Sequence, residues 1–502
     1  MATLIATLSR GRLIGAHRPW PRAEIDAAAW AGIAGELAGG HWTLLDLWGE
    51  NGAVHASVLE EPSLQIGVFT LACPDGHFPS IGAAHPAAIR LERSLDDLFG
   101  LAADGAVDRR PWLDHGRWPR RHPLAAQPQP PRPQPGYEFL PVEGEGLHQI
   151  PVGPVHAGII EPGHFRFTAN GETVVRLEAR LGYVHRGLEG LMRGAKIDHG
   201  ARLAGRASGD STVAYAYAFA RAVEAALGAD APPRAQWLRA IMAEMERLAN
   251  HLGDIGAICN DASFALMHAH CGILRERVLR TAAACWGHRL MRDRIVPGGV
   301  TADLDPERIG LVRALVAELR RRFPPLVDLY DNTTSLQDRT VATGILRPEL
   351  ARRFGAGGYV GRASGRGFDA RRMTGYFPYN LLRFEVPMRD EGDVNARVWI
   401  RIKEVEQSLG LIDQMLGQLP DGAVRVELPL RAGEGMALVE GFRGDVLARV
   451  RLGADGAIEH CRLRDPSWFQ WPLLEAVVEG NIVADFPLCN KSFNCSYAGS
   501  DL

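Results

Sequence analysis

No two of the seven cysteines in this 502-residue chain have the C-x-x-C spacing. The missing spacing excludes the usual paired-thiolate metal sites, and an odd, scattered set does not form a disulfide framework. The chain also lacks any run of about 18 apolar residues, so no segment is expected to cross a membrane by itself. The formal net charge of −3 gives no excess of positive charge for a nucleic-acid partner or an anionic lipid surface.

The first twelve residues lack the apolar core and the cleavage site of an export signal, so we expect a cytoplasmic protein. The length is sufficient for two or three cores, because single domains seldom exceed roughly 250–300 residues. Proline is concentrated in residues 118–137, WPRRHPLAAQPQPPRPQPGY. Such a segment favours extended polyproline II structure. We interpret it as a linker between domains 1–117 and 138–502; the alternative is a long surface loop.

Hydrophobic periodicity predicts an α+β protein: a small N-terminal α/β sandwich joined by the Pro-rich linker to a large, mainly helical domain with small peripheral β-sheets. In the large domain, Asn170-Gly171 indicates a hairpin turn within strand-like residues 158–182. The expected helices are residues 23–38, 89–101, 232–255 and 395–419, and the expected strands lie in residues 42–45, 54–59, 64–72, 158–182 and 424–461.

Several long segments in order resemble the large subunit of energy-converting (group 4) nickel–iron hydrogenases, the formate hydrogenlyase type that includes hydrogenases 3 and 4. The resemblance extends, more distantly, to the quinone-site subunit of respiratory complex I. Residues 91–101 and 108–113 resemble the thirty-kilodalton subunit of complex I, and this fused layout favours the hydrogenlyase branch. The large-domain segments are PVGPVHAGIIEPGHFRFTANGETVVRLEARLGYVHRGLE (151–189), PPRAQWLRAIMAEMERLANHL (232–252), VPGGV (296–300), GRASG (361–365) and RFEVPMRDEGDVNARVWIRIKEVEQSL (383–409).

The resemblance implies two C-x-x-C pairs whose four thiolates hold nickel and iron. The matching positions here are Ser208, Ser211, Ser496 and Gly499. A serine hydroxyl is a hard, neutral group and glycine has no side chain, whereas nickel requires soft thiolates. We therefore expect no nickel. The family removes a C-terminal extension just past the second pair, and since the chain ends near that point, at Leu502, no such processing is expected.

Cys489 and Cys495 lie near the lost pair but have five residues between them, which is no standard metal spacing. They are either ordinary buried thiols or replacement ligands. Glu161, in the motif Glu161-Pro162-Gly163-His164, matches the glutamate that passes protons in hydrogenases. The resemblance makes Glu161 and His164 candidate catalytic residues. The alternative for Glu161 is a structural carboxylate paired with Arg166 or Arg186.

Two histidines, His156 and His185, are candidate cofactor-binding residues, because this end of the domain contributes to the quinone headgroup pocket in complex I. The complex I tyrosine position is occupied here by Gly209, which puts quinone reduction of that kind in doubt. Tyr215 and Tyr217 either substitute for it or pack in the core.

Charged residues in segments that line the family's cleft are further candidates: Arg206, Asp210, Arg362 and Arg366. A buried arginine needs a partner, for which Asp210 is a candidate. The alternative is that these are solvated loop charges. The glycines of residues 361–367 lack the spacing and the βαβ setting of a dinucleotide site, so no NAD site is expected in this chain.

The resemblance implies that electrons arrive through a 4Fe–4S cluster in a small partner subunit. It also implies a ferredoxin-like subunit, membrane-embedded complex I-like subunits and a position on the inner face of the cell membrane. Quinone is a candidate acceptor, and no nucleic acid is expected. The hypothesis is a large redox subunit of an oxidoreductase complex without a nickel–iron site. The alternatives are a non-catalytic scaffold that links the cluster subunit to ion-pumping subunits, and an active hydrogenase.

Overall fold

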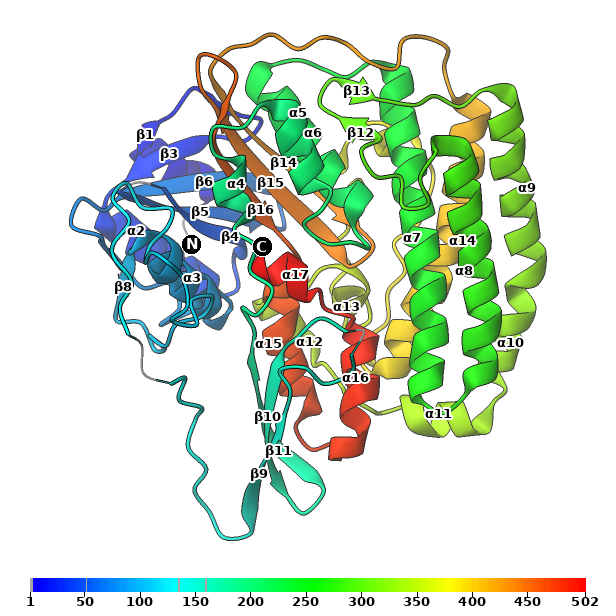
Figure 1. The fold of residues 1–502 in the computed structure, drawn as a ribbon, viewed down its shortest axis with the longest axis horizontal. Coiled ribbons are helices and arrows are strands. Elements are labelled where there is room, and N and C mark those ends of the chain that lie inside the picture. The colour runs from blue at the N-terminus through cyan, green and yellow to red at the C-terminus, as the bar shows by residue number, and fades with distance from the viewer. Residues whose placement is uncertain (1–2, 51, 134–135, 159) are drawn as a thin grey trace.

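The computed structural model describes residues 3–50, 52–133, 136–158 and 160–502. Its N-terminal sheet region lies on the left in Figure 1, long helices form the right side, and strands β14 (Gly433–Gly441), β15 (Gly444–Leu452) and β16 (Ile458–Arg464) run between them. The mixed helix and sheet content agrees with the predicted fold class at this level.

The N-terminal region contains a five-stranded sheet in the order β1-β3-β6-β5-β4. The helices predicted near residues 23–38 and 89–101 and the three predicted strands are present, except that residues 22–25 form strand β3. The Asp26 side chain then accepts from Ala29 N and starts the helix. The elements are α1 (Leu4–Arg10), β1 (Arg12–Leu13), β3 (Arg22–Ile25), α2 (Ala27–Ala38), β4 (Thr43–Glu50), β5 (Ala53–Glu60), β6 (Gln65–Ala72), β7 (His77–Pro79), η1 (Pro86–Ala88), α3 (Ile89–Phe99) and β8 (Ala102–Asp104).

The first part of the Pro-rich segment lies against the N-terminal region. Leu124 is buried, and its backbone N–H donates to Leu98 O at 2.9 Å. The His122 ring bonds to Asp96 O at 2.7 Å. Arg121 and Gln129 exchange two backbone hydrogen bonds. Only the later residues of the segment are continuously exposed, so the extended linker expected over 118–137 is shorter than the proline content suggests.

Four long helices form the core of the large domain: α7 (Pro233–Asp261), α8 (Ala265–Trp286), α9 (Pro306–Arg322) and α14 (Val394–Gln418). The apolar residues of α7 and α14 face this core, as their periodicity predicts. Helix α6 (Thr212–Leu227) packs against β14 and β15. The shorter elements are α4 (Leu188–Met192), α5 (Ile197–Ala204), β12 (Ile295–Val296), β13 (Gly299–Val300), α10 (Pro324–Asp331), α11 (Thr334–Thr340), α12 (Pro348–Arg353), α13 (Gly358–Arg362), η2 (Arg371–Gly375), η3 (Tyr379–Leu381), α15 (Ser467–Val478), η4 (Val483–Asp485), α16 (Phe486–Phe493) and α17 (Tyr497–Asp501).

A three-stranded sheet, β9 (Leu147–Val152), β10 (His164–Asn170) and β11 (Thr173–Arg180), projects from the body at the bottom of Figure 1. Strands β10 and β11 form the predicted hairpin, with Gly171 at a φ of 57° in the turn. The loop between β9 and β10 carries Glu161 and returns to α17. The hairpin therefore brings the first motif of the resemblance to the end of the chain.

The N-terminal region docks on the large domain through its own surface. Strand β2 (His17–Arg18) pairs in parallel with β14 and so becomes the edge of the large-domain sheet. Ion pairs reinforce this junction. The buried pairs join Glu50 to Arg449 and Asp46 to Arg462, and partly exposed pairs join Glu50 to Arg451 and Glu61 to Arg366. Across the ranges that the structure describes, no helix is long and apolar enough to span a membrane.

Candidate functional site

The four positions that match the lost cysteines come together in the fold. Ser208 and Ser211 lie between α5 and α6, and Ser496 begins α17, which contains Gly499. The Ser208 and Ser496 hydroxyl oxygens are 2.9 Å apart, and Gly499 N donates to Ser496 Oγ at 2.9 Å. All three serines are at most 5% exposed. We call these four residues the serine site.

An arginine–aspartate pair lies directly beside the serine site. Arg443, in the turn between β14 and β15, donates to Asp210 Oδ1 at 2.7 Å and to Ser211 Oγ at 3.2 Å. Ser208 donates to the same carboxylate oxygen at 2.9 Å. Although burial opposes ionisation, the Arg443 guanidinium lowers the pKa of Asp210 to about 2. Asp210 therefore pairs with Arg443, a residue that no sequence motif singled out, and not with one of the candidate arginines.

The Asp465 carboxylate occupies the space beside Gly499, the fourth position of the serine site. Its Oδ2 accepts from Tyr215 OH at 2.7 Å, and its Oδ1 accepts from Ser467 N at 2.8 Å. A Cβ atom placed on Gly499 would lie 2.4 Å from Asp465 Oδ2. Burial, with the neighbouring Asp465 carboxylate, raises the pKa of Tyr215 well above its ordinary value, so the phenol stays protonated as the donor of this bond. Any larger residue at position 499 must displace this pair.

The groups at the serine site do not match the requirements of a nickel–iron centre. Hydroxyls replace the soft thiolates at three positions, and glycine offers no side chain at the fourth. In the described ranges, no group of three or more His, Cys, Asp or Glu side chains is placed to hold a metal ion. Cys489 and Cys495 are buried, and burial raises the pKa of Cys489 to about 11, so it remains a protonated thiol.

The Glu161 carboxylate bonds to helix α17. Its Oε2 accepts from Ala498 N at 2.9 Å. Glu161 is exposed, and within the described part it pairs with neither Arg166 nor Arg186. His156, on the same loop, has its ring centre 6.3 Å from that of Tyr497. Glu161 and His156 therefore both approach α17.

His164, the second catalytic candidate, contacts Phe139 and Arg166 and not helix α17. Its ring centre lies 4.8 Å from that of Phe139, and its Nε2 accepts from Arg166 Nε at 3.4 Å. Burial, followed by the Arg166 charge, lowers its pKa. His164 thus packs within the projecting sheet region, and no contact joins it to Glu161 among the described residues.

The three candidate arginines are also dispersed. Arg206 pairs with Asp293 at 2.7 Å on the surface, and Arg366 pairs with Glu61 of the N-terminal region at 2.6 Å. Arg362 is fully buried among acidic side chains and does not contact Asp210. Tyr217 is buried and packs against Tyr376. The charged candidates therefore do not form one cleft.

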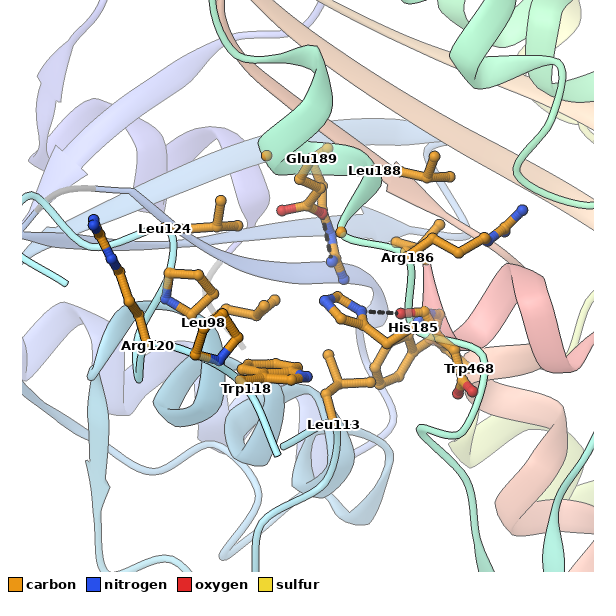
Figure 2. A pocket seen from close by; sticks show the side chains of 17 residues that line it. Leu98, Leu113, Trp118, Arg120, Leu124, His185, Arg186, Leu188, Glu189 and Trp468 are labelled. Atoms are coloured by element: carbon orange, nitrogen blue, oxygen red, sulfur yellow. Dashed lines mark hydrogen bonds and ion pairs between the residues drawn. The ribbon is translucent and has the colours of Figure 1, made fainter. Parts of the chain in front are cut away.

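A cavity of about 370 Å³ opens where the N-terminal region, residues 118–124 and the large domain meet. We call it the junction cavity. Figure 2 shows His185 extending into it beside Trp118, whose ring centre is 4.9 Å away. Both sequence reasoning and the structure single out His185, whereas Trp118 was assigned to the linker. The other apolar lining side chains include Leu98, Leu113, Leu124, Leu188 and Trp468.

The polar groups of the junction cavity are few and mostly paired. His185 Nδ1 lies 2.6 Å from the backbone oxygen of Asp501, which can only accept, so Nδ1 carries the proton. Burial lowers the pKa of His185, and neutral Nε2 is then an acceptor without a partner in the described part. Glu189 is paired with Arg462 at 3.0 Å. The cavity therefore suits an uncharged molecule that donates a hydrogen bond.

Comparison with known proteins identifies the chain's relatives. Residues 262–432 match the family described as "Respiratory-chain NADH dehydrogenase, 49 Kd subunit". Formate hydrogenlyase subunit 5 of Escherichia coli is 34% identical over 84% of this chain and 77% of its own length. The chain belongs to this family. This confirms the resemblance found in the sequence. The chain is a subunit of the kind found in hydrogenase and NADH–quinone oxidoreductase complexes.

The names of other similar proteins refer to different activities. A carbon monoxide-induced hydrogenase of Rhodospirillum rubrum is 32% identical, covering 69% of this chain and 97% of the relative. An NADH-quinone oxidoreductase subunit of Desulfotalea psychrophila is also 32% identical, covering 69% and 95%. A chain of the membrane-bound sulfane sulfur reductase, an archaeal respiratory membrane complex, superimposes with a TM-score of 0.68 at 26% identity, covering 72% of this chain and all of that one.

Proposed function

We propose that this chain is the large redox subunit of a membrane-associated complex related to hydrogenlyase and complex I, and that it operates without a nickel–iron centre. The serine site carries this proposal. Ser208 and Ser496 bond to each other, and the Asp210–Arg443 pair lies against them. A buried guanidinium and neutral hydroxyls favour neither nickel nor the thiolate chemistry that splits hydrogen.

In the proposed complex, electrons arrive from a 4Fe–4S cluster in a small partner subunit and leave to a quinone or another acceptor. A ferredoxin-like subunit and membrane-embedded subunits complete the assembly, on the inner face of the cell membrane. The names of the relatives support a range of acceptors, since they include an NADH-quinone oxidoreductase and a sulfane sulfur reductase. This chain itself carries no nicotinamide site in the proposal.

The junction cavity is our candidate acceptor site. Its walls are apolar, and His185 Nε2 accepts a hydrogen bond. A quinone carbonyl offers no donor, but the hydroxyl of the reduced form does. In the proposal, His185 binds the hydroxyl of the product, and Trp118 covers its ring. Replacing His185 with phenylalanine should therefore weaken binding of the reduced acceptor more than that of the oxidised one.

A scaffold role is the second candidate, and the closed serine site favours it. Each serine hydroxyl there already has a partner within the chain, so the site offers no open position for a reacting molecule. In this alternative, the large domain holds the cluster subunit against the membrane subunits and transmits conformational change to them.

Glu161→Gln in the purified complex separates the two candidates. The amide retains an oxygen for Ala498 N, so assembly should persist, but it cannot carry a proton. The redox role predicts loss of turnover in an assembled complex, while the scaffold role predicts unchanged turnover. Glu172→Gln is the matched control, because Glu172 is exposed at the tip of the same hairpin. Turnover by Glu161→Gln equal to that of the control would count against the redox proposal.

A further inference from the structure

Eight ionisable side chains form a closed group in the middle of the large domain, away from the serine site. Each is at most 2% exposed. They come from helices α7, α13 and α14, from strand β14, and from the segment that enters the turn η2. We call this group the core cluster: Glu244, Arg247, His251, Arg362, Asp369, Arg371, Glu404 and Glu440.

Arg362 lies at the centre of the core cluster. Its guanidinium reaches Glu404 Oε1 at 2.7 Å, Glu440 Oε1 at 2.9 Å and Asp369 Oδ2 at 3.4 Å. Arg371 joins Asp369 at 2.7 Å to Glu244 at 2.9 Å. The remaining arginine, Arg247, lies 3.3 Å from Glu244 and 3.6 Å from Glu404, and His251 Nε2 lies 2.7 Å from Glu404 Oε2. The contacts thus form one continuous network.

The charges of the core cluster do not balance. Four carboxylates face three guanidinium groups, which leaves one negative charge without a counter-charge. Three neighbouring arginines do not supply it, because Arg401 pairs with Asp254, Arg464 pairs with Asp445 and Arg443 pairs with Asp210. An unbalanced charge in so buried an environment is strongly unfavourable, and binding of a proton neutralises that charge.

His251 is a poor place for that proton. Its Nε2 already donates to Glu404, and its buried Nδ1 has no hydrogen-bond partner among the described residues. A second proton on the ring would create a buried N–H without an acceptor. Burial also lowers the pKa of His251. The proton therefore belongs on a carboxyl group.

Glu440 is the least stabilised carboxylate of the four. Glu244 receives bonds from Arg247 and Arg371 and from two hydroxyls, and Glu404 receives bonds from His251 and Arg362. Asp369 is held by two nitrogens of Arg371 and by a backbone N–H. Among the described residues, the donors to Glu440 are one nitrogen of the shared Arg362 and the N–H of Ala370.

We propose that the core cluster is a proton-binding site, with one proton held on Glu440 and exchanged when the charge in its surroundings changes. Burial, and then the Asp369 carboxylate, raises the pKa of Glu440 to about 7, in agreement with the charge count. Glu440 ends β14, and Arg443 of the serine site follows in the next turn. One short turn thus joins the proton-binding site to the serine site.

Ionisable groups from several elements face Glu440 or share its partners, and they enter its titration. Arg247 of α7, Arg362 of α13, Asp369 before η2 and Asp445 of β15 act on it directly. Arg371 and Glu404 share the partners Asp369 and Arg362. The Tyr376 hydroxyl accepts from Glu440 N at 3.2 Å, and the Arg221 guanidinium of α6 lies over the Tyr376 ring. The proposal does not depend on the acceptor or on Glu161, so a Glu161→Gln complex without altered turnover would leave it intact.

Infrared difference spectra of the purified complex, recorded between about pH 5 and pH 9, test the proposal. A protonated buried carboxyl group has a carbonyl band apart from those of carboxylates, and the band should disappear as the pH rises through neutrality. Burial also raises the pKa of Asp97 to about 6, of Asp501 to about 7 and of Glu246 to about 8, so their carboxyl groups titrate in the same range. Glu440→Gln should therefore remove one titrating component from the carbonyl region and leave the others. The exposed control Glu459→Gln should leave the whole titrating signal unchanged. A titrating signal in Glu440→Gln equal to that of the unmutated complex would overturn the assignment.

A second variant tests the charge count itself. Asp369→Asn removes one carboxylate, so three carboxylates then face three guanidinium groups and no proton is needed. The midpoint of the Glu440 band should move to lower pH. An unmoved midpoint contradicts the proposal. If neither variant folds, the unmutated complex still tests the proposal, because the absence of any titrating carboxyl band throughout this pH range would overturn the proposal.

Discussion

Gly499→Ala adds a single methyl group where the fourth thiolate of a nickel–iron centre would begin. The new Cβ atom would lie 2.4 Å from Asp465 Oδ2, 2.7 Å from Asp465 Cγ and 2.9 Å from Ser496 Oγ. Asp465 cannot move freely, since Tyr215 OH and Ser467 N hold its two oxygens. The methyl group must therefore displace α17 or break the buried Tyr215–Asp465 hydrogen bond.

The loss of folding free energy can be worked out for either outcome, displacement of α17 or loss of the Tyr215–Asp465 hydrogen bond. Overpacking a well-filled interior costs about 1–3 kcal/mol, and leaving the Tyr215 hydroxyl buried without its partner costs about 1–3 kcal/mol. The two routes are alternatives, so we expect a loss of about 2 kcal/mol. A matched control is Gly410→Ala in α14, where a Cβ atom meets nothing within 4 Å. Alanine should stabilise that helix by about 0.5–1 kcal/mol.

Thermal unfolding of the purified protein measures both variants. Gly499→Ala should lower Tm by roughly 2–5 °C, while Gly410→Ala should leave Tm unchanged or slightly raised. If Gly499→Ala is as stable as the unmutated protein, the fourth position has room for a side chain. The interpretation of the serine site as a filled cavity would then be wrong.

Two further predictions concern the domain junction. Cleavage of the exposed residues 126–133 should leave the N-terminal region bound, because β2 pairs with β14 and buried ion pairs cross the junction; separation of the fragments on gel filtration would contradict this. Despite burial, Arg449 holds the pKa of Glu50 well below its ordinary 4.5. This carboxylate therefore stabilises the junction above pH 4.5 and loses its effect as the pH falls further. Proteolysis at the junction should increase in acid. Glu50→Gln leaves Arg449 with Glu434 as its remaining carboxylate partner, and this variant should show the increase at neutral pH; equal rates for both proteins would refute this.

The regular elements were predictable because each carries its own periodic signal. Helices α7 and α14 and the hairpin β10–β11 follow directly from apolar spacing and from Asn170-Gly171. The pairing of β2 with β14 was not predictable, since two strand residues more than 400 positions from their partner carry no such signal. The contacts of residues 121–129 were also not predictable, because proline content describes the backbone and not the packing of a side chain such as Leu124.

The candidate site was predictable only in part. The resemblance placed Ser208, Ser211, Ser496 and Gly499 at matching positions, and the fold brings them together. Arg443 and Asp465, which fill the space among them, lie in segments without a motif, and only the three-dimensional packing reveals them. Glu161 accepts from the backbone N–H of Ala498 in α17, a contact between distant segments that the motif Glu161-Pro162-Gly163-His164 does not predict.

Nickel content and hydrogen turnover of the purified complex test the central claim most directly. With three hydroxyls and a glycine at the four ligand positions, we predict nickel far below one atom per chain by elemental analysis. We also predict no hydrogen uptake or evolution attributable to this subunit. Stoichiometric nickel, or hydrogen turnover that disappears when Ser208 and Ser496 are replaced by alanine, would contradict the account.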